Sequence, residues 1–202
     1  MGRASGHDEE PGRGGISRGV PDGTPQPLLL PADWLNSHSM RLYLVRHGMA
    51  EDNNPAGDAE RALTPKGRLR MAQEARGLRD LKARPEIILT SPLRRALETA
   101  TIVSQELGAI RVELLHELGP GPQGPAEILA ALEPYNNLRE VALVGHLPAL
   151  AELASFMLTG SPSDCQIELK KGAVACLEQA PAQGQDRFVL IWLLPPKVLR
   201  SL

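Results

Sequence analysis

The chain has 202 residues, 42% of them hydrophobic, which is enough for one domain with a sizeable core. Its formal net charge of −2 gives no basic field for nucleic acid, so an anion site must be built from a few placed residues. No apolar run approaches the roughly 20 residues that cross a membrane, and we expect neither a membrane span nor a secretion signal. Cys165 and Cys176 fit neither a disulfide framework nor a zinc site, so we expect reduced thiols in a cytoplasmic protein.

Residues 1–39 are expected to be a flexible extension. They show little apolar periodicity and many glycines and prolines, so burial cannot easily offset the entropy lost on ordering them. The first dense apolar segment begins at Met40, and we expect one folded domain over 40–202. The sequence leaves the purpose of the upstream residues and the true start of the protein open.

From Met40 onward, short apolar runs alternate with longer periodic ones. This alternation is typical of strands joined by crossover helices in a mostly parallel sheet. We therefore predict an α/β fold, a three-layer sandwich in which helices flank a mostly parallel central sheet. The predicted strands cover residues 41–46, 86–90, 110–114, 140–144, 173–178 and 188–193.

The first predicted helix begins at Thr64-Pro65. Thr64 has the side chain of an N-cap, and Pro65 suits the first helical position because its missing N–H is not needed there. The expected buried stripe of this helix comprises Leu69, Ala72, Ala75 and Leu78.

Two more helices are predicted to begin at similar dipeptides. Ser91-Pro92 repeats the start, and its helix should end at Gly108 as a left-handed cap. Leu147-Pro148 opens a third helix that should end at Gly160. The second helix has an expected buried stripe of Leu93, Ala96, Leu97, Ala100, Val103 and Leu107.

Three strand-to-helix junctions carry charged or imidazole side chains. The first contains Arg46 and His47, the second Arg94 and Arg95, and the third His146. Because the carboxyl edge of an open α/β sheet is the usual place for a ligand crevice, we expect the junctions to converge. Guanidinium groups are planar forks of donors that match phosphoryl oxygens, so the sequence predicts a phosphate site.

An imidazole beside this phosphate can act as nucleophile under one condition. One ring nitrogen must be unprotonated and face phosphorus, while the other donates its proton to a fixed acceptor. Gly48 should help, because a residue without Cβ lets the chain turn sharply and a ligand approach closely. The phosphoryl charge should favour a cationic His146, whereas His47 must stay neutral to attack.

The ordered set of motifs resembles the histidine phosphatase superfamily, also called phosphoglycerate mutase-like, and within it the SixA-like phosphohistidine phosphatases. The resemblance runs from Met40 to about Leu194. It is carried by Arg46-His47-Gly48, Ser91-Pro92-x-x-Arg95-Ala96-x-x-Thr99, Gly145-His146 and Arg61-x-Leu63-Thr64-x-x-Gly67.

The resemblance implies a role for five residues. His47 would be the catalytic nucleophile, and Arg46, Arg95 and His146 would hold the phosphoryl oxygens; Arg94 is not in the matching position. The family's frequent proton donor is a glutamate after the third strand, for which Glu117 is the candidate. We expect no cofactor, and we find no carboxylate or thiolate cluster fit to bind a metal.

These residues predict a phosphohydrolase that works through a covalent phosphohistidine. Only short segments separate the junctions, which leaves little chain for a lid and suits a bulky substrate such as phosphohistidine on a protein. Two alternatives stay open: a phosphomonoesterase for small phosphorylated metabolites, and a module that binds phosphorylated partners without turnover. We expect a monomer that binds neither nucleic acid nor membrane.

Simpler interpretations exist for several of these residues. His47 would be a solvent-facing loop residue, and Arg46 would be an ordinary surface charge. Arg95 would pair only with Glu98 or Thr99, and His146 would merely begin its helix. Ser91, Thr64 and Thr99 are expected to be caps or helix surface rather than nucleophiles. The first helix also has a basic face, for which both a solvated surface and a docking site for acidic partners stay open. That face comprises Arg68, Arg70, Arg76 and Arg79.

Overall fold

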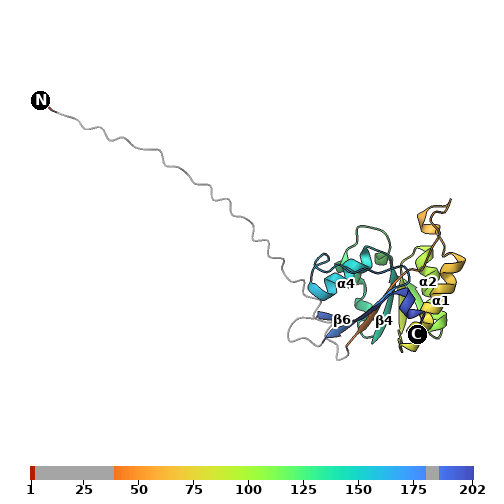
Figure 1. The fold of residues 1–202 in the computed structure, drawn as a ribbon. Helices are drawn as coiled ribbons and strands as arrows, with labels where there is room; N and C mark the ends of the chain where they lie inside the picture. Colours follow the sequence, from red (N-terminus) through yellow and green to blue (C-terminus); the bar gives the residue numbers. More distant parts are fainter. Residues whose placement is uncertain (3–38, 181–186) are drawn as a thin grey trace.

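The structure is a computed structural model that describes residues 1–2, 39–180 and 187–202 (Figure 1). Its strands are β1 (Arg41–Arg46), β2 (Ile87–Thr90), β3 (Arg111–Leu114), β4 (Glu140–Gly145), β5 (Val174–Ala180) and β6 (Arg187–Leu194). Its α-helices are α1 (Pro65–Asp80), α2 (Arg94–Glu106), α3 (Pro125–Ala131), α4 (Ala149–Thr159) and α5 (Pro196–Leu199). Short 3₁₀ helices are η2 (Asp58–Glu60), η3 (His116–Leu118) and η4 (Glu133–Tyr135). All six predicted strands are confirmed, each within two residues at both ends.

The strands form one sheet in the order β3-β2-β4-β1-β5-β6. The first four are parallel, whereas β5 pairs antiparallel with β1 and β6 antiparallel with β5. The register places Arg46 opposite Gly145 and Thr90 opposite Val144. The three predicted junctions therefore leave the sheet at the same level of its carboxyl edge.

Helices cover both faces of the sheet, which confirms the predicted α/β sandwich (Figure 1). Leu42 and Leu44 of β1 face the core that contains α3 and α4. Tyr43 and Val45, one residue out of phase, face the core that contains α1, α2 and α5. Because β1 is covered on both faces, it is apolar along its length rather than alternating.

The start of α1 agrees with the sequence, but the other two starts differ in detail. Thr64 Oγ1 accepts the N–H of Gly67 at 2.9 Å, with Pro65 in the first turn. The helix α2 begins at Arg94 with Leu93 as N-cap, so the prediction that Ser91 caps it is wrong. The reason lies in the tertiary contacts of Ser91, whose hydroxyl contacts His146.

The predicted glycines lie at the carboxyl ends of α2 and α4. Pro148 is the N-cap of α4 rather than its first residue, and α4 ends at Gly160 in the left-handed region, with φ 84°. Gly108, just beyond α2, has φ 106°. A residue without Cβ adopts these angles at little cost, which explains why both helices end there.

The predicted buried faces of α1 and α2 are partly wrong. Leu69 is 70% exposed and Leu97 is 40% exposed. The helix α1 instead turns a face with two glycines inward, since a Cβ on Gly67 would lie 2.0 Å from the carbonyl oxygen of Met49 and one on Gly77 2.0 Å from that of Leu199. Close backbone approach, which a hydrophobic pattern does not record, therefore sets this face.

Other sequence-based expectations concern termini, thiols and membranes. Both cysteines are free, and Cys176 lies in the core of the α1 face. The expected extension 1–39 lies almost wholly outside the described residues, so the domain boundary at Met40 stays a prediction. Within the described ranges, none of the helices has the length and apolar character to span a membrane.

A buried ion pair joins the C-terminal segment to the domain. Glu74 of α1 is 2% exposed, and its carboxylate accepts a hydrogen bond from Arg200 just after α5. Burial raises the pKa of Glu74 to about 7 from its ordinary 4.5, while the Arg200 guanidinium acts in the opposite direction. The ionised carboxylate is therefore tolerated in the folded state because Arg200 is beside it.

Replacing Arg200 by alanine should lower the free energy of unfolding by about 3 kcal/mol at pH 8, because the substitution leaves a buried charge without its partner. The loss should shrink at pH 6. A carboxyl group whose pKa is raised on folding binds its proton below that pKa, and the neutral form needs no partner. Urea unfolding at the two pH values measures both effects, with the exposed Lys197→Ala as control. An equal loss at both values would contradict an ionised Glu74 as the cause.

Candidate active site

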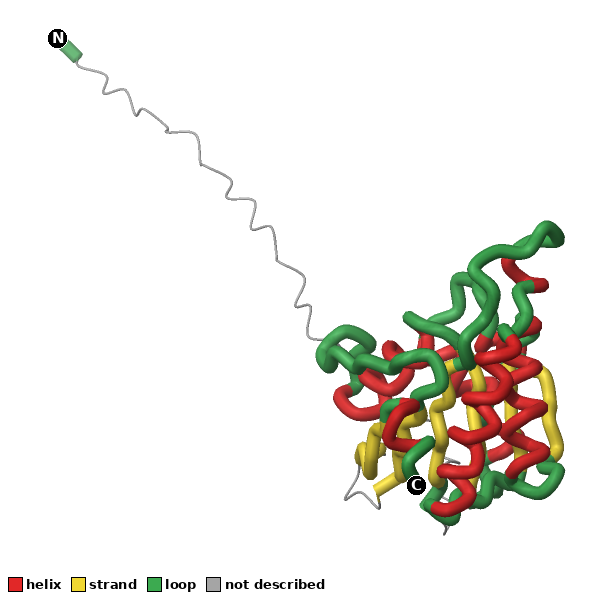
Figure 2. Tube along the Cα trace, turned by 45° about the vertical axis from the view of Figure 1, so that its right-hand side comes forward, coloured by secondary structure: helices red, strands yellow, loops and turns green. Residues whose placement is uncertain are grey.

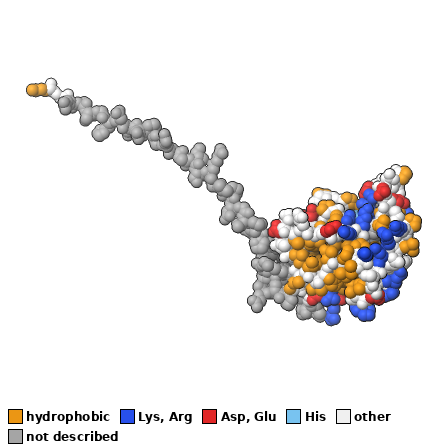
Figure 3. Space-filling view, in the orientation of Figure 1, with side chains coloured by type: hydrophobic (Ala, Val, Ile, Leu, Met, Phe, Trp, Pro, Cys, Tyr) orange, Lys and Arg blue, Asp and Glu red, His pale blue; other side chains and the backbone are white. Residues whose placement is uncertain are grey.

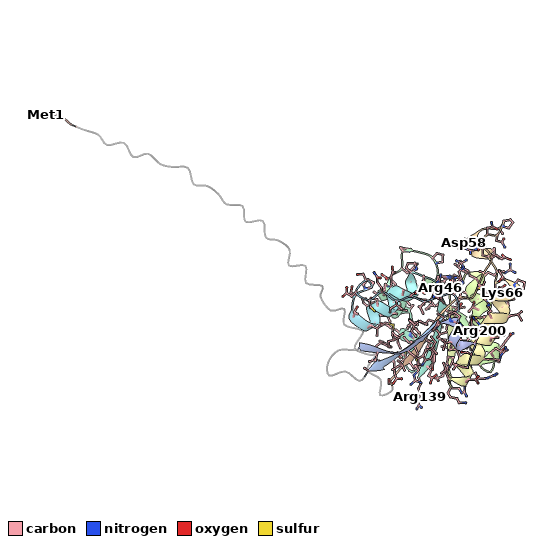
Figure 4. The ribbon with its side chains drawn as sticks, in the orientation of Figure 1. Met1, Arg46, Asp58, Lys66, Arg139 and Arg200 are labelled. Carbon is pink, nitrogen blue, oxygen red and sulfur yellow. The ribbon has the colours of Figure 1, made fainter. Side chains whose placement is uncertain are left out.

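The three junctions bring their imidazole and guanidinium groups together at the carboxyl edge of the sheet. The ring centroids of His47 and His146 are 4.9 Å apart, with an angle of 50° between the planes. The charges of Arg46 and Arg95 act on both rings. Figure 4 shows Arg46 and Asp58 toward one end of the domain and Arg139, which precedes β4, at the other. The predicted convergence of Arg46, His47, Arg95 and His146 is thus present.

His47 is held by the backbone of the turn that contains it. Its Nδ1 lies 2.8 Å from the carbonyl oxygen of Gly48, which can only accept, so Nδ1 carries the proton and Nε2 has the free lone pair. This arrangement meets the condition set for a nucleophile. The ring is 6% exposed, so few other orientations are open to it.

Burial also keeps this ring neutral. It lowers the pKa of His47 to about 4, and the cations of Arg95, Arg46 and Lys171 act in the same direction, against the hydrogen bond to Gly48. A neutral imidazole is the nucleophilic form. At neutral pH the environment therefore favours the state that can attack phosphorus.

Thr99 and Gly172 fix the turn from both sides. The N–H of Gly48 donates to Thr99 Oγ1 at 3.0 Å, and Thr99 donates to the carbonyl oxygen of Arg95 at 2.7 Å. The N–H of Gly172 lies 3.1 Å from the carbonyl oxygen of Arg46 and 3.2 Å from that of His47. Thr99 is fully buried, so its interpretation as helix surface is wrong: it joins α2 to the nucleophile's turn.

Gly48 itself does not behave as expected. Its φ is not in the left-handed region, and a Cβ there would lie 3.4 Å from Leu63 and farther from other atoms, which is ordinary contact. The backbone angle at Gly48 therefore does not require a glycine, and the close approach of a ligand there stays a prediction. Gly67, whose Cβ would strike the carbonyl oxygen of Met49, is the glycine this region requires.

His146 is oriented by Ser91. The Ser91 hydroxyl lies 2.8 Å from His146 Nε2 and already accepts the N–H of Leu93, so its own hydrogen is available to Nε2. In the tautomer in which Ser91 donates to Nε2, the ring proton lies on Nδ1, which is buried without a hydrogen-bond partner in the described structure. A buried donor without a partner at an anion site is one that a phosphoryl oxygen would satisfy.

The charge of His146 depends on whether an anion occupies the site. Burial lowers its pKa to about 3, and the neighbouring His47, Arg95 and Arg46 add to this, opposed by Asp58. His146 is thus neutral in this structure, so the prediction of a cation applies only once a phosphoryl anion lies among these groups. The sequence could not reveal how deeply the ring is buried.

One N–H group of Arg46 donates to a protein acceptor, and another that is buried has none. Its Nη1 donates to the carbonyl oxygen of Leu169 at 2.7 Å, which fixes the guanidinium beside the loop before β5. Its Nε is buried and has no partner among the described residues. Arg46 Nε and His146 Nδ1 are therefore two buried N–H groups, on side chains predicted to hold the same phosphoryl group.

Arg95 is paired with a residue that sequence analysis missed. It is 8% exposed, and its Nη1 and Nη2 donate to the main-chain oxygen of Asp58 at 2.8 Å and to its carboxylate at 3.0 Å. The alternative pairing with Glu98 is wrong, because Glu98 binds Arg94 and Arg68 instead. One feature of the sequence could have pointed to Asp58, namely its place three residues before Arg61. The guanidinium of Arg61 forms an ion pair with the Asp58 carboxylate.

The loop that carries Asp58 lies between β1 and α1. The segment between β1 and α1 projects from the domain (Figure 2), and an isolated bridge between Ala50 and Leu63 closes its base. The loop reaches Arg95 through Asp58. The short connection after β1 therefore does contribute to the site, although little chain is available for a larger cover.

Glu117 stays a prediction. It lies in η3, directly after β3, the edge strand next to β2. Glu117 therefore lies at the carboxyl ends of the strands, as the two histidines do. In the described structure no hydrogen bond or ion pair joins it to the four converging residues. Asp58 is the carboxylate in direct contact with one of them. Within the described ranges, no group of three or more His, Cys, Asp or Glu side chains is placed to hold a metal ion.

Comparison with known proteins identifies the family. The family model of the histidine phosphatase superfamily (branch 1) matches residues 42–121. The solved structure of the protein histidine phosphatase SixA complexed with tungstate superposes with a TM-score of 0.69 and 25% identity, over 79% of this chain and 99% of that one. The chain belongs to the histidine phosphatase superfamily. It is accordingly a phosphatase of the SixA-like type.

Two further proteins are similar to this histidine phosphatase. A protein of Picosynechococcus sp. whose function is uncharacterised is 36% identical over 176 residues, which cover 77% of this chain and all of the relative. The α-ribazole phosphatase of Shigella flexneri has the same fold, with a TM-score of 0.62 and 18% identity over 78% of this chain and 97% of that one. Proteins of this fold are thus named for protein and for small-molecule substrates.

Replacing Asp58 by asparagine should tighten binding of inorganic phosphate by about threefold, because a negative charge leaves the Arg95 guanidinium while the shape is kept. Isothermal titration calorimetry measures the affinity. Glu60→Gln, next to Asp58 but paired with Arg94, is the matched control and should not change it. Weaker binding in Asp58→Asn would mean that the carboxylate orients Arg95 for the ligand instead of competing with it.

The ring of His47 should remain neutral, with its proton on Nδ1, from pH 8 down to about pH 5, and gain a second proton only near pH 4. The reason is that burial penalises the cation. Nitrogen-15 NMR of the imidazoles reports both protonation and tautomer, and a His47→Gln variant assigns the signal. Titration near 6.5, the value of an exposed imidazole, would disprove this account.

Proposed function

We propose that this phosphatase removes phosphoryl groups through a covalent phosphohistidine on His47, and that its substrate is phosphohistidine on a protein. One observation supports the proposal most strongly. The Nδ1 proton of His47 is bound by the Gly48 carbonyl, which leaves Nε2 as a nucleophile 4.9 Å, ring to ring, from His146. The catalytic domain in this proposal is residues 40–202.

The first step is in-line displacement on phosphorus. Nε2 of His47 forms the new N–P bond while the bond to the leaving nitrogen breaks. Arg46 and His146 donate to the equatorial oxygens through the N–H groups that have no protein partner. Arg95 adds its positive charge once its hydrogen bond to the Asp58 carboxylate is broken. Catalysis is then mostly positioning and charge neutralisation.

The second step is hydrolysis of the phosphoenzyme. Water attacks phosphorus from the side that the leaving group vacated, the N–P bond to His47 breaks, and Nε2 regains its lone pair. One proton of the water passes to a phosphoryl oxygen, so the product is dihydrogen phosphate. The hydrogen bond from Nδ1 to Gly48 persists throughout, so the ring ends in the tautomer in which it began. No change of oxidation state is involved.

The ease with which the leaving group departs favours a phosphoramidate as the substrate. A phosphorylated imidazole that is protonated on its second nitrogen leaves as neutral imidazole, so it needs no strong acid beside it. An alkoxide needs a proton, and no hydrogen bond or ion pair joins Glu117, the predicted donor, to the four converging residues in the described structure. The 25% identity with a protein histidine phosphatase over nearly its whole length also supports this substrate class.

A small phosphorylated metabolite is the second candidate. The observation in its favour is the loop whose Asp58 reaches Arg95, since a contact above the phosphate site suits a compact ligand better than a fully open site would. The fold shared with an α-ribazole phosphatase is compatible with this. A binding module without turnover would not need the neutral, oriented His47.

Brief exposure to a ³²P-labelled phosphohistidine protein should label the wild-type enzyme in an acid-labile form, and His47→Ala should carry no label. The variant should lose activity by about 10⁴-fold or more, because the covalent route is closed. Label on His47→Ala, or no label on an active wild type, would exclude the covalent intermediate. In the same assay, faster turnover of sugar or nucleotide phosphates than of phosphohistidine protein would favour the second candidate.

A further inference from the structure

A basic pocket lies beside the nucleophile's turn. It has a volume of about 400 Å³ and lies between α1, the turn before β5 and the 195–200 segment that contains α5. Five cationic side chains line it against one carboxylate, that of Glu74. The five are Arg70, Lys170, Lys171, Lys197 and Arg200.

Most of this positive charge is not neutralised by the protein. Arg200 is committed to Glu74, and Lys170 only approaches the exposed Glu168 at 3.8 Å. Arg70 contacts the sulfur of Met49 at 3.2 Å, which is a weak acceptor, and has no ion pair in the described structure. The described residues also provide none for the two lysines that remain, Lys171 and Lys197.

The contrast with the rest of α1 is informative. Of the basic helix face, Arg68 binds Glu98 at 2.7 Å, and Arg76 and Arg79 approach Glu106 at 3.1 and 3.8 Å. These three arginines join α1 to α2 and are structural. Arg70 alone of the four lines the pocket. The sequence left open whether this helix face is a solvated surface or a docking site for acidic partners, and the second alternative still applies to Arg70.

The pocket is connected to the nucleophile. The N–H of Gly172, next to Lys171, binds the carbonyl oxygens of Arg46 and His47, and the charge of Lys171 is felt at the His47 ring. Met49, two residues beyond His47, lines the pocket. In the view of Figure 4 Arg200 lies apart from Arg139, and Figure 3 shows Lys and Arg side chains gathered on one part of the surface.

We propose that this pocket binds an acidic segment of the phosphorylated protein, whose Asp and Glu side chains lie against Arg70, Lys171 and Lys197 while its phosphohistidine lies at His47. This rests on the proposed function and names the kind of protein it acts on. The buried Glu74 makes the floor of the pocket unfavourable for an anion, so the carboxylates are held by side-chain tips at the rim. Lysines on flexible stems suit such a segment better than one compact anion of fixed geometry.

The test compares two phosphohistidine peptides of equal length, in which the residues flanking the phosphohistidine are all Glu or all Gln. The wild type should have a kcat/KM about tenfold higher on the Glu peptide, through KM, and 0.5 M NaCl should reduce the ratio. In Arg70→Gln/Lys197→Gln the ratio should fall to near one. Neither side chain has an ion pair in the described structure, so the double variant should fold.

Arg84→Gln/Arg139→Gln is the matched control. It removes the same charge at the amino edge of the sheet, where Arg84 and Arg139 are both exposed, and it should keep the wild-type ratio. A wild-type ratio near one, a ratio that survives in Arg70→Gln/Lys197→Gln, or an equal fall in the control would overturn the proposal.

A binding measurement separates this inference from the proposed function. A fluorescent hexaglutamate peptide without phosphate should bind the wild type and the control alike, and Arg70→Gln/Lys197→Gln about tenfold more weakly. If neither phosphohistidine peptide is turned over, the proposed function fails, and this peptide still decides the pocket. Equal affinity for all three proteins would overturn the acidic segment as its ligand.

Discussion

The pairing of β1 with β4 is the constraint on which the site depends. Its parallel register places Arg46 opposite Gly145, so the residues that follow, His47 and His146, leave the sheet side by side. A shift of β1 by one residue would exchange the side chains that it presents to the two cores, and packing on both faces therefore holds the register. The distance between the imidazoles thus depends on the whole core as well as on the local hydrogen bonds that orient each ring.

Around this pair, burial and charge act together. Burial lowers the pKa of both histidines, and the nearby arginines add to this effect, which keeps the nucleophile neutral. The anion is left to donors that are always charged or have no protein partner. The same charges would make the free site costly, and Asp58 offsets part of that cost by pairing with Arg95. The site is therefore organised before a ligand arrives, as electrostatic catalysis requires.

The surface near the site divides into paired and unpaired charge. Where α1 meets α2, arginines and glutamates neutralise one another and hold the helices together. Where α1 meets α5 and the turn before β5, cations outnumber the single buried carboxylate. One helix thus carries both the paired charges that face α2 and the unpaired Arg70 of the basic pocket, on residues a few positions apart.

Much about this protein follows from its sequence. Apolar runs and N-cap signals are local properties, so they predicted six strands, the start of α1 and the end of α4. The order of Arg46, His47, Arg95 and His146 along the chain predicted which side chains meet, because parallel strands share one carboxyl edge. The contact of Asp58 with Arg95, the role of Ser91 beside His146 and the inward face of α1 were decided only by the tertiary structure. Each depends on how closely segments distant in sequence approach, and no local pattern of residues encodes that distance.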